Sequence, residues 1–329
     1  MPKAIQVHTN GAPDVLQWEN VEVRAPARGE VRIRHTAVGL NYIDVYFRKG
    51  TYPAPGFPFI PGMEAAGRVE ALGPDVTEFR PGDRVAYAGA LGAYAEQRIM
   101  PAERLVKLPD SIDDRTAAAM MLKGMTAQYL LRRVYAVKAG DTILLHAAAG
   151  GVGLIACQWA KRLGATVIGT VGSEEKAELA AAHGCDHPII YTREDFVARV
   201  KKITGGDGVP VVYDSVGADT FMRSLDCLRP FGLMVSFGQS SGNVAPLDIG
   251  VLSQKGSLFL TRPTLMTYTA RRTDLLATAS ELFEVVGRGE VRIEIGRSFA
   301  LRDARDAHRA LESRETAGST VLLPESQVP

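Results

Sequence analysis

The sequence predicts an α/β fold with two domains, one rich in short β-strands and one built on a doubly wound parallel sheet. The 329 residues are too many for one typical domain, and a hydrophobic share of 46% can fill two cores. Short β-rich segments with turn signals occupy residues 31–108, whereas strand and helix patterns alternate from Thr142 onward. Such alternation is typical of a parallel sheet with helical crossovers.

The first part of the chain has the pattern of a compact, partly closed β domain. Turn signals such as LGPDV and RPGDR separate its predicted strands. These strands are VRIRHTAVG (31–39), AAGRVEALG (65–73), DRVAYAG (83–89) and YAEQRIM (94–100). A long helical pattern rich in Ala, Met and Leu follows from Ile112 to Val134, with Ser111 as its predicted cap. A domain boundary is therefore expected near Ser111.

The second part predicts six strands joined by right-handed crossovers. The strands are TILLHA (142–147), TVIGTV (166–171), PIIY (188–191), PVVYDSV (210–216), GLMVSFG (232–238) and SLFLTR (257–262). The helices are predicted at Val152–Leu163, Glu174–His183, Glu194–Ile203 and Ala218–Leu228. The remainder predicts a helix at Thr273–Val286, a strand EVRIEIG (290–296), a helix near Ala304–Glu312 and a strand STVLL (319–323). Those last strands are expected to return to the first domain.

The most informative stretch runs from Asp141 to Ser173, where a glycine cluster separates an apolar run from an amphipathic helix. Gly150, Gly151 and Gly153 lack Cβ atoms, so the backbone can approach a pyrophosphate while Val152 opens a helix whose amides face that anion. Ala148 occupies the first position of the G-x-G-x-x-G fingerprint, which is therefore met in part. The stretch predicts a dinucleotide site; the alternative is a tight turn that binds nothing.

Charge and cysteine content restrict the classes of partner. The 38 basic and 37 acidic residues leave a net charge of +1, which gives no electrostatic footprint for nucleic acid or an anionic membrane, so small molecules are the expected partners. Cys157, Cys185 and Cys227 fit neither a disulfide framework nor a zinc cluster, and Cys157 and Cys227 are expected as small apolar residues in helices. The N-terminus has no signal-peptide pattern, and glycines interrupt the most apolar stretch, so we predict a cytoplasmic protein without membrane insertion.

Several segments resemble one family over nearly the whole chain. They are NYIDVYFRKGTYP (41–53), PGMEAAGRV (61–69), GDRVAY (82–87), HAAAGGVGLIACQWAK (146–161), VVYDSVG (211–217) and SLDCL (224–228). Together they resemble the zinc-free quinone oxidoreductases of the medium-chain dehydrogenase/reductase superfamily. The resemblance implies a GroES-like catalytic domain at 1–122, completed by 267–329, and an inserted Rossmann domain at 123–266. It also implies a homodimer joined through the Rossmann domains and a substrate cleft between the two domains.

The same resemblance indicates which residues are expected to take part in catalysis. Zinc-dependent members of the superfamily have Cys or His ligands where this chain has Asn41, Met63 and Lys123, so no metal is expected. Asn41 and Lys123 are expected to face the nicotinamide, and Lys123 to steady negative charge on the reduced product. Tyr46 and Tyr52 are expected in the substrate pocket, where a phenol offers a ring face and a hydroxyl donor; the alternative is that both are packing aromatics.

The cofactor is expected to be NADPH. About twenty residues past the glycine turn, where NAD-preferring enzymes place a carboxylate, this chain has Gly172, and Ser173 and Lys176 can bind a 2′-phosphate. Tyr191 resembles the family's position beside the adenosine. Glu174 and Glu175 depart from the family pattern, although carboxylates in a first helical turn also stabilise the helix dipole.

Further positions match the family's cofactor cleft and follow strand ends or the long helix. They are Thr126, Tyr129, Val216, Gly217, Phe237, Gly238, Gln239, Ser240 and Arg262. Asp214 lies at a strand end as well. It is expected either as a partner of backbone or capping groups or as a catalytic residue, and the role of general acid is not assigned to it.

The predicted function is an NADPH-dependent quinone oxidoreductase that works without metal. A quinone has a low-lying acceptor orbital, so positioning beside the nicotinamide carries most of the catalysis. One alternative is a reductase of the double bond of an enone or alkenal, which accepts hydride conjugatively in the same way. The other is a non-enzymatic protein, since some relatives of this family are lens structural proteins or bind RNA.

Overall fold

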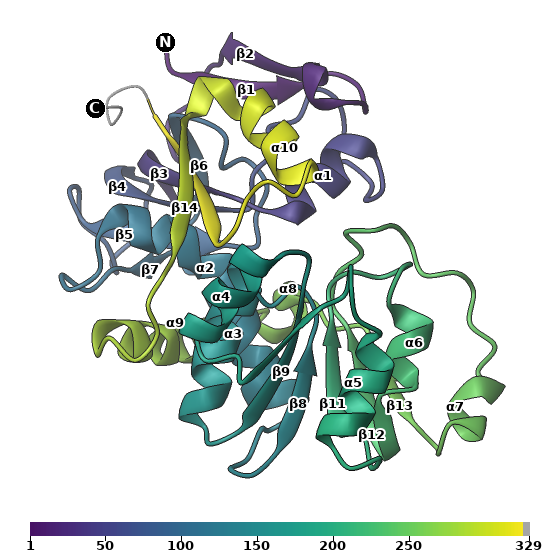
Figure 1. Cartoon of the computed structure of the whole chain (residues 1–329). Coiled ribbons are helices and arrows are strands. Elements are labelled where there is room, and N and C mark those ends of the chain that lie inside the picture. Colours follow the sequence, from purple (N-terminus) through teal and green to yellow (C-terminus); the bar gives the residue numbers. More distant parts are fainter. Residues whose placement is uncertain (325–329) are drawn as a thin grey trace. The chain divides into compact units, whose positions relative to one another are not determined.

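The computed structural model describes residues 1–324, which form two compact units (Figure 1). One unit comprises Met1–Met125, Thr269–Gly287 and the chain from Ile293 onward, and the other comprises Thr126–Tyr268 and Arg288–Arg292. A mixed seven-stranded sheet forms the centre of the first and a parallel six-stranded sheet the centre of the second, which confirms the α/β class. None of the helices within residues 1–324 has the length and hydropathy needed to cross a bilayer.

The parallel sheet has the strand order β10-β9-β8-β11-β12-β13. Its strands are β8 (Thr142–Leu145), β9 (Thr166–Val171), β10 (His187–Ile190), β11 (Val209–Asp214), β12 (Leu228–Ser236) and β13 (Phe259–Thr261). The chain starts in the middle, adds two strands on one side and then three on the other. The order therefore reverses between β8 and β11, and open α/β sheets bind ligands at the carboxyl ends of strands at such a point.

Helices connect these strands and cover the apolar side chains of the sheet. They are α3 (Gly151–Arg162), α4 (Glu174–Ala182), α5 (Phe196–Ile203), α6 (Phe221–Leu225), α7 (Gly250–Gln254) and α8 (Leu265–Tyr268). Leu144 and Val212 of the central strands share one core with Phe196 and Val200 of α5 and with Phe221 of α6. Burial of these side chains stabilises the unit by about 1.5–3 kcal/mol for each fully buried large residue.

The seven-stranded sheet joins distant parts of the chain. Its strands are β3 (Glu30–Leu40), β4 (Glu64–Leu72), β5 (Arg84–Ala88), β6 (Gln97–Pro101), β7 (Val106–Lys107), β14 (Ile295–Ala300) and β15 (Ser319–Leu323). β15 pairs antiparallel with β3, with Thr320 opposite Leu40, so the expected return of the last strands to the first unit is confirmed. In β3, Val31, Ile33 and His35 are buried, while the side chains between them are not, as the two-residue period of a strand requires.

The remaining elements complete this description. β1 (Lys3–Val7) and β2 (Leu16–Asn20) form a two-stranded sheet. The helices are α1 (Tyr42–Lys49), α2 (Asp114–Tyr129), α9 (Arg272–Gly287) and α10 (Ala304–Glu312). Short 3-10 turns lie at Pro13–Val15, Ala102–Arg104 and Leu301–Asp303, and a π-helical turn at Leu130–Val134 extends α2. The single helix predicted at Ile112–Val134 thus changes type after Tyr129.

Two predicted helix boundaries are wrong, each because a hydrogen bond competes with the local pattern. Asp113, and not Ser111, caps α2, since its carboxylate accepts the Thr116 N–H at 2.9 Å. The helix predicted at Ala218–Leu228 ends at Leu225, because the Cys227 carbonyl accepts the Val209 N–H at 2.8 Å at the start of β12. Cys227 is therefore buried outside a helix.

The strand predicted at 290–296 is displaced to Ile295–Ala300. The Gln158 side chain bonds both backbone groups of Arg292: its amide donates to the carbonyl at 2.9 Å and its oxygen accepts the N–H at 2.9 Å. These bonds satisfy backbone groups that a strand would offer to a neighbouring strand.

A chain of buried hydrogen bonds links α10 to α1 within the first unit. Arg48 donates to Nδ1 of His308 at 3.1 Å, so Nε2–H of His308 donates to the Tyr94 hydroxyl at 3.0 Å, and Tyr94 donates to Asp44 at 3.1 Å. Burial, together with the Arg48 charge, lowers the pKa of His308 to about 3. Burial raises the pKa of Asp44 to about 7. The imidazole of His308 is therefore neutral in the folded protein.

The low pKa of His308 predicts a specific dependence of stability on pH. The unfolded histidine binds a proton near pH 6.5, so stability from the neutral imidazole is complete above that value and is lost as pH falls toward 3. In His308→Gln, the loss of unfolding free energy between about pH 6.5 and pH 5, measured by urea unfolding, is expected to be about 2 kcal/mol smaller than in the wild type. Exposed His8 offers the control variant His8→Gln, expected to behave as the wild type; identical pH dependence in His308→Gln would contradict the assignment.

Candidate functional site

The glycine turn lies between β8 and α3, at the point where the strand order reverses. The Gly150 N–H donates to the Ala147 carbonyl at 2.9 Å, and Gly150 then caps α3. A Cβ atom on Gly153 would lie 2.3 Å from the Ala147 oxygen, so only glycine fits there. The amides of Gly151 and Val152 lie in the first helical turn, where no intrahelical acceptor exists. A diphosphate fits this cradle of free amides.

The loop after β11 is held by a buried carboxylate. Asp214 accepts the N–H groups of Val216 at 2.7 Å and Gly217 at 3.1 Å, and the Thr220 hydroxyl at 2.8 Å. Gly217 has a φ of 91°, which favours glycine. Of the two roles that the sequence left open for Asp214, these bonds support the structural one, because both carboxylate oxygens accept bonds from their own loop.

The loop after β12 is bound to its neighbours on both sides. Phe237 donates its N–H to the Asp214 carbonyl at 2.8 Å. From the end of β13, Arg262 donates to the carbonyl of Gly238 at 2.9 Å and to the side chain of Gln239 at 3.0 Å. Ser240 donates its N–H to the Ser215 carbonyl at 3.1 Å. The structure thus brings together the predicted cofactor residues that follow β11, β12 and β13.

His146 is a residue that sequence reasoning did not assign to the site. It follows β8 and is buried; its Nδ1 lies 2.8 Å from the Thr170 hydroxyl, and its Nε2 lies 2.9 Å from the Ser224 hydroxyl. Since Ser224 donates its hydrogen to the Thr220 carbonyl at 2.8 Å, it accepts from Nε2–H of His146. Burial lowers the pKa of His146. His146 thus links β8 to β9 and α6. The only sequence signal for this role was its position at the end of the apolar run that precedes the glycine turn.

The positions expected at the ribose phosphate gather at the end of β9. A Cβ atom on Gly172 would lie 3.0 Å from the Tyr191 hydroxyl. Ser173 caps α4 and accepts the Lys176 N–H at 3.4 Å. The Ser173 hydroxyl also bonds the Glu175 carboxylate, and this bond is the main reason why the pKa of Glu175 is lowered.

Arg193 adds a cation that sequence reasoning missed. Its guanidinium pairs with Glu174 at 3.1 Å on the surface. Glu174, Glu175 and Lys176 are consecutive in α4, so the formal charges of these three side chains and of Arg193 cancel.

The end of α2 carries the other two positions expected near the cofactor. Thr126 is buried, and the ring of Tyr129 stacks on the ring of Tyr268 with centroids 4.7 Å apart. Burial raises the pKa of Tyr129, while a hydrogen bond with Thr126 opposes that rise. Tyr129 is therefore held as a neutral phenol with a fixed ring plane.

In the first unit, Glu64 joins the two residues expected in catalysis. Its Oε1 accepts the Asn41 side-chain amide at 2.8 Å and the Lys123 ammonium at 2.5 Å, and its Oε2 accepts the Leu122 N–H at 2.6 Å. The Glu64 side chain is fully buried, and Asn41 and Lys123 are each 6% exposed. Glu64 directly follows Met63 in the segment PGMEAAGRV, and this position is the sequence signal that points to it.

Tyr46 and Tyr52 lie against each other near the end of α1. Their ring centroids are 5.2 Å apart in an edge-to-face arrangement, and the Tyr52 N–H donates to the Tyr46 carbonyl at 3.2 Å. Phe47 packs edge-on to Tyr52 at 5.7 Å. Such packing fixes the planes of both phenols.

The family resemblance puts the zinc ligands of metal-dependent relatives at Asn41, Met63 and Lys123, and the chemistry of these three side chains can be compared with what zinc requires. Asn41, Met63 and Lys123 are all buried, and none is a usual zinc ligand. No group of three or more His, Cys, Asp or Glu side chains within residues 1–324 is arranged to hold a metal ion. The donor set at Asn41, Met63 and Lys123 therefore does not fit zinc.

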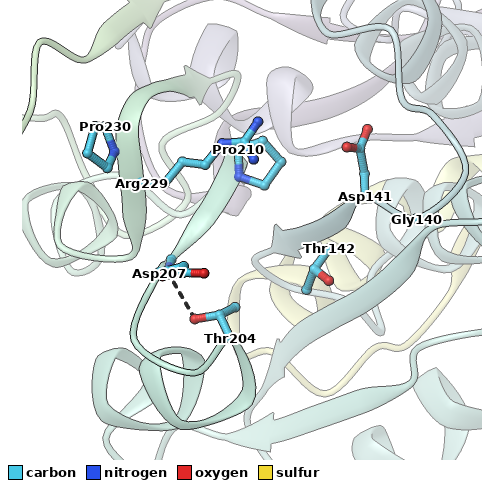
Figure 2. Close-up of a pocket in the computed structure, with 9 residues that line it drawn as sticks. Gly140, Asp141, Thr142, Thr204, Asp207, Pro210, Arg229 and Pro230 are labelled. Carbon is cyan, nitrogen blue, oxygen red and sulfur yellow. Dashed lines mark hydrogen bonds between the residues drawn. The ribbon is translucent and has the colours of Figure 1, made fainter.

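A separate pocket lies at the amino-terminal ends of β8, β11 and β12, whereas the glycine turn follows the carboxyl end of β8 (Figure 2). Its volume is about 430 Å³, and Asp141, Asp207 and Arg229 are its charged lining residues. The Asp207 N–H donates to the Thr204 carbonyl at 3.2 Å. None of the expected cofactor or catalytic residues lines this pocket.

Two family models match the chain. The model for the "Alcohol dehydrogenase GroES-like domain" matches residues 27–110, and the model for "Zinc-binding dehydrogenase" matches residues 151–284. The first range covers β3 to β7, and the second begins at α3 directly after the glycine turn. These matches place a GroES-like and a Rossmann-type domain in one chain.

Full-length relatives include quinone oxidoreductases. A "Quinone oxidoreductase" of Pseudomonas aeruginosa is 55% identical over 98% of this chain and 100% of its own length. A "2-haloacrylate reductase" of Burkholderia sp is 48% identical over 99% of this chain and 100% of its own length. The solved structure of Escherichia coli quinone oxidoreductase complexed with NADPH has a TM-score of 0.96 and 48% identity, and the match covers 98% of this chain and 100% of that one.

Substitution of Gly153 tests the dinucleotide cradle. In Gly153→Ala, the new Cβ meets the Ala147 oxygen at 2.3 Å, so the turn must move. NADPH binding, measured by fluorescence titration, is expected to weaken by about tenfold or more, which corresponds to about 1.4 kcal/mol. Gly287→Ala in α9 is the matched control, because its nearest neighbour there, the Ser111 hydroxyl, is 3.5 Å away. Equal NADPH affinity in both variants would show that the turn does not bind the cofactor.

Proposed function

Because the chain belongs to the quinone oxidoreductases of the medium-chain dehydrogenase/reductase superfamily, we propose that it is an NADPH-dependent quinone oxidoreductase. The observation that carries this conclusion is the full-length match, at a TM-score of 0.96, to a quinone oxidoreductase solved with NADPH. The glycine cradle after β8 supports it, since its free amides and missing Cβ atoms suit a diphosphate.

The residues of the second unit bind and orient the cofactor. Gly150, Gly151 and Val152 present backbone amides to the diphosphate. The loops after β11 and β12, together with Arg262, Thr126 and Tyr129, bound the remainder of the site. NADPH, when bound, supplies the reducing equivalents from its nicotinamide ring.

The 2′-phosphate is held at the end of β9. Gly172 leaves room, Ser173 and Lys176 donate hydrogen bonds, and the Tyr191 ring lies beside the adenosine. Glu174 and Glu175 oppose a dianionic phosphate, and Arg193 offsets one of them through its ion pair at 3.1 Å. NADPH is preferred over NADH, with a smaller margin than Lys176 alone would give.

The residues of the first unit bind and polarise the quinone without a metal. Lys123 supplies a cation and Asn41 an amide, both bonded to Glu64, at positions where the family resemblance puts zinc ligands of metal-dependent relatives. Both are donors that can stabilise negative charge on the reduced oxygen. Tyr46 and Tyr52 offer ring faces for stacking and hydroxyls for the quinone oxygen.

Reduction of an activated alkene is the second candidate function. The 2-haloacrylate reductase of Burkholderia sp is 48% identical over the full length. A 2-haloacrylate has a double bond conjugated to a carboxylate, and such a bond accepts hydride at the carbon remote from the electron-withdrawing group. The donors Asn41 and Lys123 suit this chemistry as well, because charge also develops on oxygen there.

A homodimer through the Rossmann-type units and a cytoplasmic setting complete the proposal. β13 is the last strand of the parallel sheet within residues 1–324, and its Phe259 and Leu260 are 60% and 40% exposed. An edge strand with apolar side chains favours pairing with a second copy. The buried thiols of Cys157, Cys185 and Cys227 support a reducing compartment.

Steady-state kinetics tests the proposed function. NADPH oxidation with benzoquinone, naphthoquinone and a simple enone is expected to give the highest kcat/KM with a quinone, and NADPH is expected to exceed NADH with each acceptor. Dominance of the enone would establish the alkene reductase instead. A higher kcat/KM with NADH would mean that Glu174 and Glu175 outweigh Ser173 and Lys176.

A charge on the edge strand tests the proposed dimer. Phe259→Asp places a carboxylate where two copies would meet, so light scattering after size exclusion is expected to find a monomer where the wild type is a dimer. Met222→Asp on α6 is the control, because Met222 is similarly apolar and 47% exposed. A dimeric Phe259→Asp variant would exclude β13 as the interface.

A further inference from the structure

We propose that Glu64 is the positioning residue of the catalytic group, holding Asn41 and Lys123 as a pair of hydrogen-bond donors aimed at the substrate oxygen. This inference rests on the proposed function for the substrate and on the structure for the contacts. Glu64 does not itself reach the substrate in this proposal; it acts through the amide of Asn41 and the ammonium of Lys123.

The first argument is the fit of the carboxylate to its slot. Glu64 lies opposite Gly39 in the β3–β4 pairing, and a Cβ atom on Gly39 would lie 2.3 Å from Oε1 of Glu64. The same Cβ would lie 2.2 Å from the Ala118 carbonyl of α2. Gly39 thus leaves the space in which the Glu64 side chain passes from the sheet to the helix.

The second argument is that only an ionised carboxylate satisfies this slot. Both oxygens of Glu64 accept hydrogen bonds: Oε1 from Asn41 and Lys123, and Oε2 from the Leu122 N–H. A glutamine has one acceptor oxygen and one donor NH₂ group. Whichever way the amide turned, its NH₂ would face another donor, and buried donors without acceptors are costly.

The third argument concerns what the carboxylate does to its two partners. Because a carboxylate only accepts, the Asn41 group that faces it must be the NH₂, which fixes the orientation of the amide. Lys123 donates one N–H to Glu64 and keeps two more. One carboxylate therefore fixes the positions of the remaining N–H groups of Asn41 and Lys123. Two donors positioned in this way can stabilise negative charge that develops on a substrate oxygen.

The pairing also sets the net charge of the group. The Glu64 carboxylate balances the Lys123 ammonium, so the buried pair is neutral before a substrate binds. A buried ammonium without its partner would carry a large desolvation cost. Glu64 thereby allows a full positive charge to be kept inside the protein where the reduced oxygen gains negative charge.

The kinetic test compares Glu64→Gln, Lys123→Gln and the double variant. Each single substitution is expected to lower kcat with a quinone by about 10- to 100-fold, with the Kd for NADPH unchanged. Since both residues act as one unit, the double variant is expected to lose no more than the worse single variant. Glu64→Asp keeps the charge and is expected to recover part of kcat. Glu70→Gln on the same strand is the matched control; Glu70 pairs with Arg34 on the surface side and should leave kcat unchanged.

A second measurement is independent of turnover. A hydrogen-bonded ammonium exchanges slowly with water, so the side-chain ¹⁵N–¹H signal of Lys123 is expected in the wild type and in Glu64→Asp, but not in Glu64→Gln. Persistence of the signal in Glu64→Gln, or additive losses of kcat in the double variant, would overturn the proposal. If no quinone oxidises NADPH while the signal depends on Glu64, the proposed function fails and the anchoring of Lys123 stands.

Discussion

The carboxyl ends of the parallel strands are where backbone groups leave regular pairing, and the expected cofactor residues depend on the hydrogen bonds that these groups make. Asp214 accepts hydrogen bonds from the amides of its own loop, and Arg262 donates to the Gly238 carbonyl in the next loop. His146 bonds hydroxyl groups from β9 and α6. With these groups satisfied inside the protein, the amides of the first turn of α3 remain for an anion.

In the first unit, buried charge must likewise be matched by hydrogen-bond partners. Glu64 is surrounded by donors from β3's end, from α2's backbone and from the Lys123 side chain. Asp44 is less well compensated, since its second oxygen has no hydrogen-bond partner in the described structure and its pKa is raised to about 7. Both carboxylates are buried, but of the two only Glu64 has a cation within hydrogen-bond distance.

Sequence reasoning predicted the strands of the parallel sheet to within a few residues, because each is a short apolar run bounded by turns. It failed where a side chain from elsewhere decides a boundary, as Gln158 does at Arg292 and Asp113 at the start of α2. The family resemblance supplied the expected cofactor positions, and the strand order explains why those after β11, β12 and β13 lie at the carboxyl ends of neighbouring strands. The roles of His146, Arg193 and Glu64 could not be predicted, because their partners are distant along the chain.

The sequence by itself determined the α/β class and the glycine turn, since each depends on residue type and local spacing alone. Only the tertiary structure decided that one carboxylate, Glu64, serves both Asn41 and Lys123. Those residues are separated by 23 and 59 positions from Glu64. Pairing of β3 with β4 and packing of α2 on that sheet bring them together, and no local pattern records which buried donors will share one acceptor.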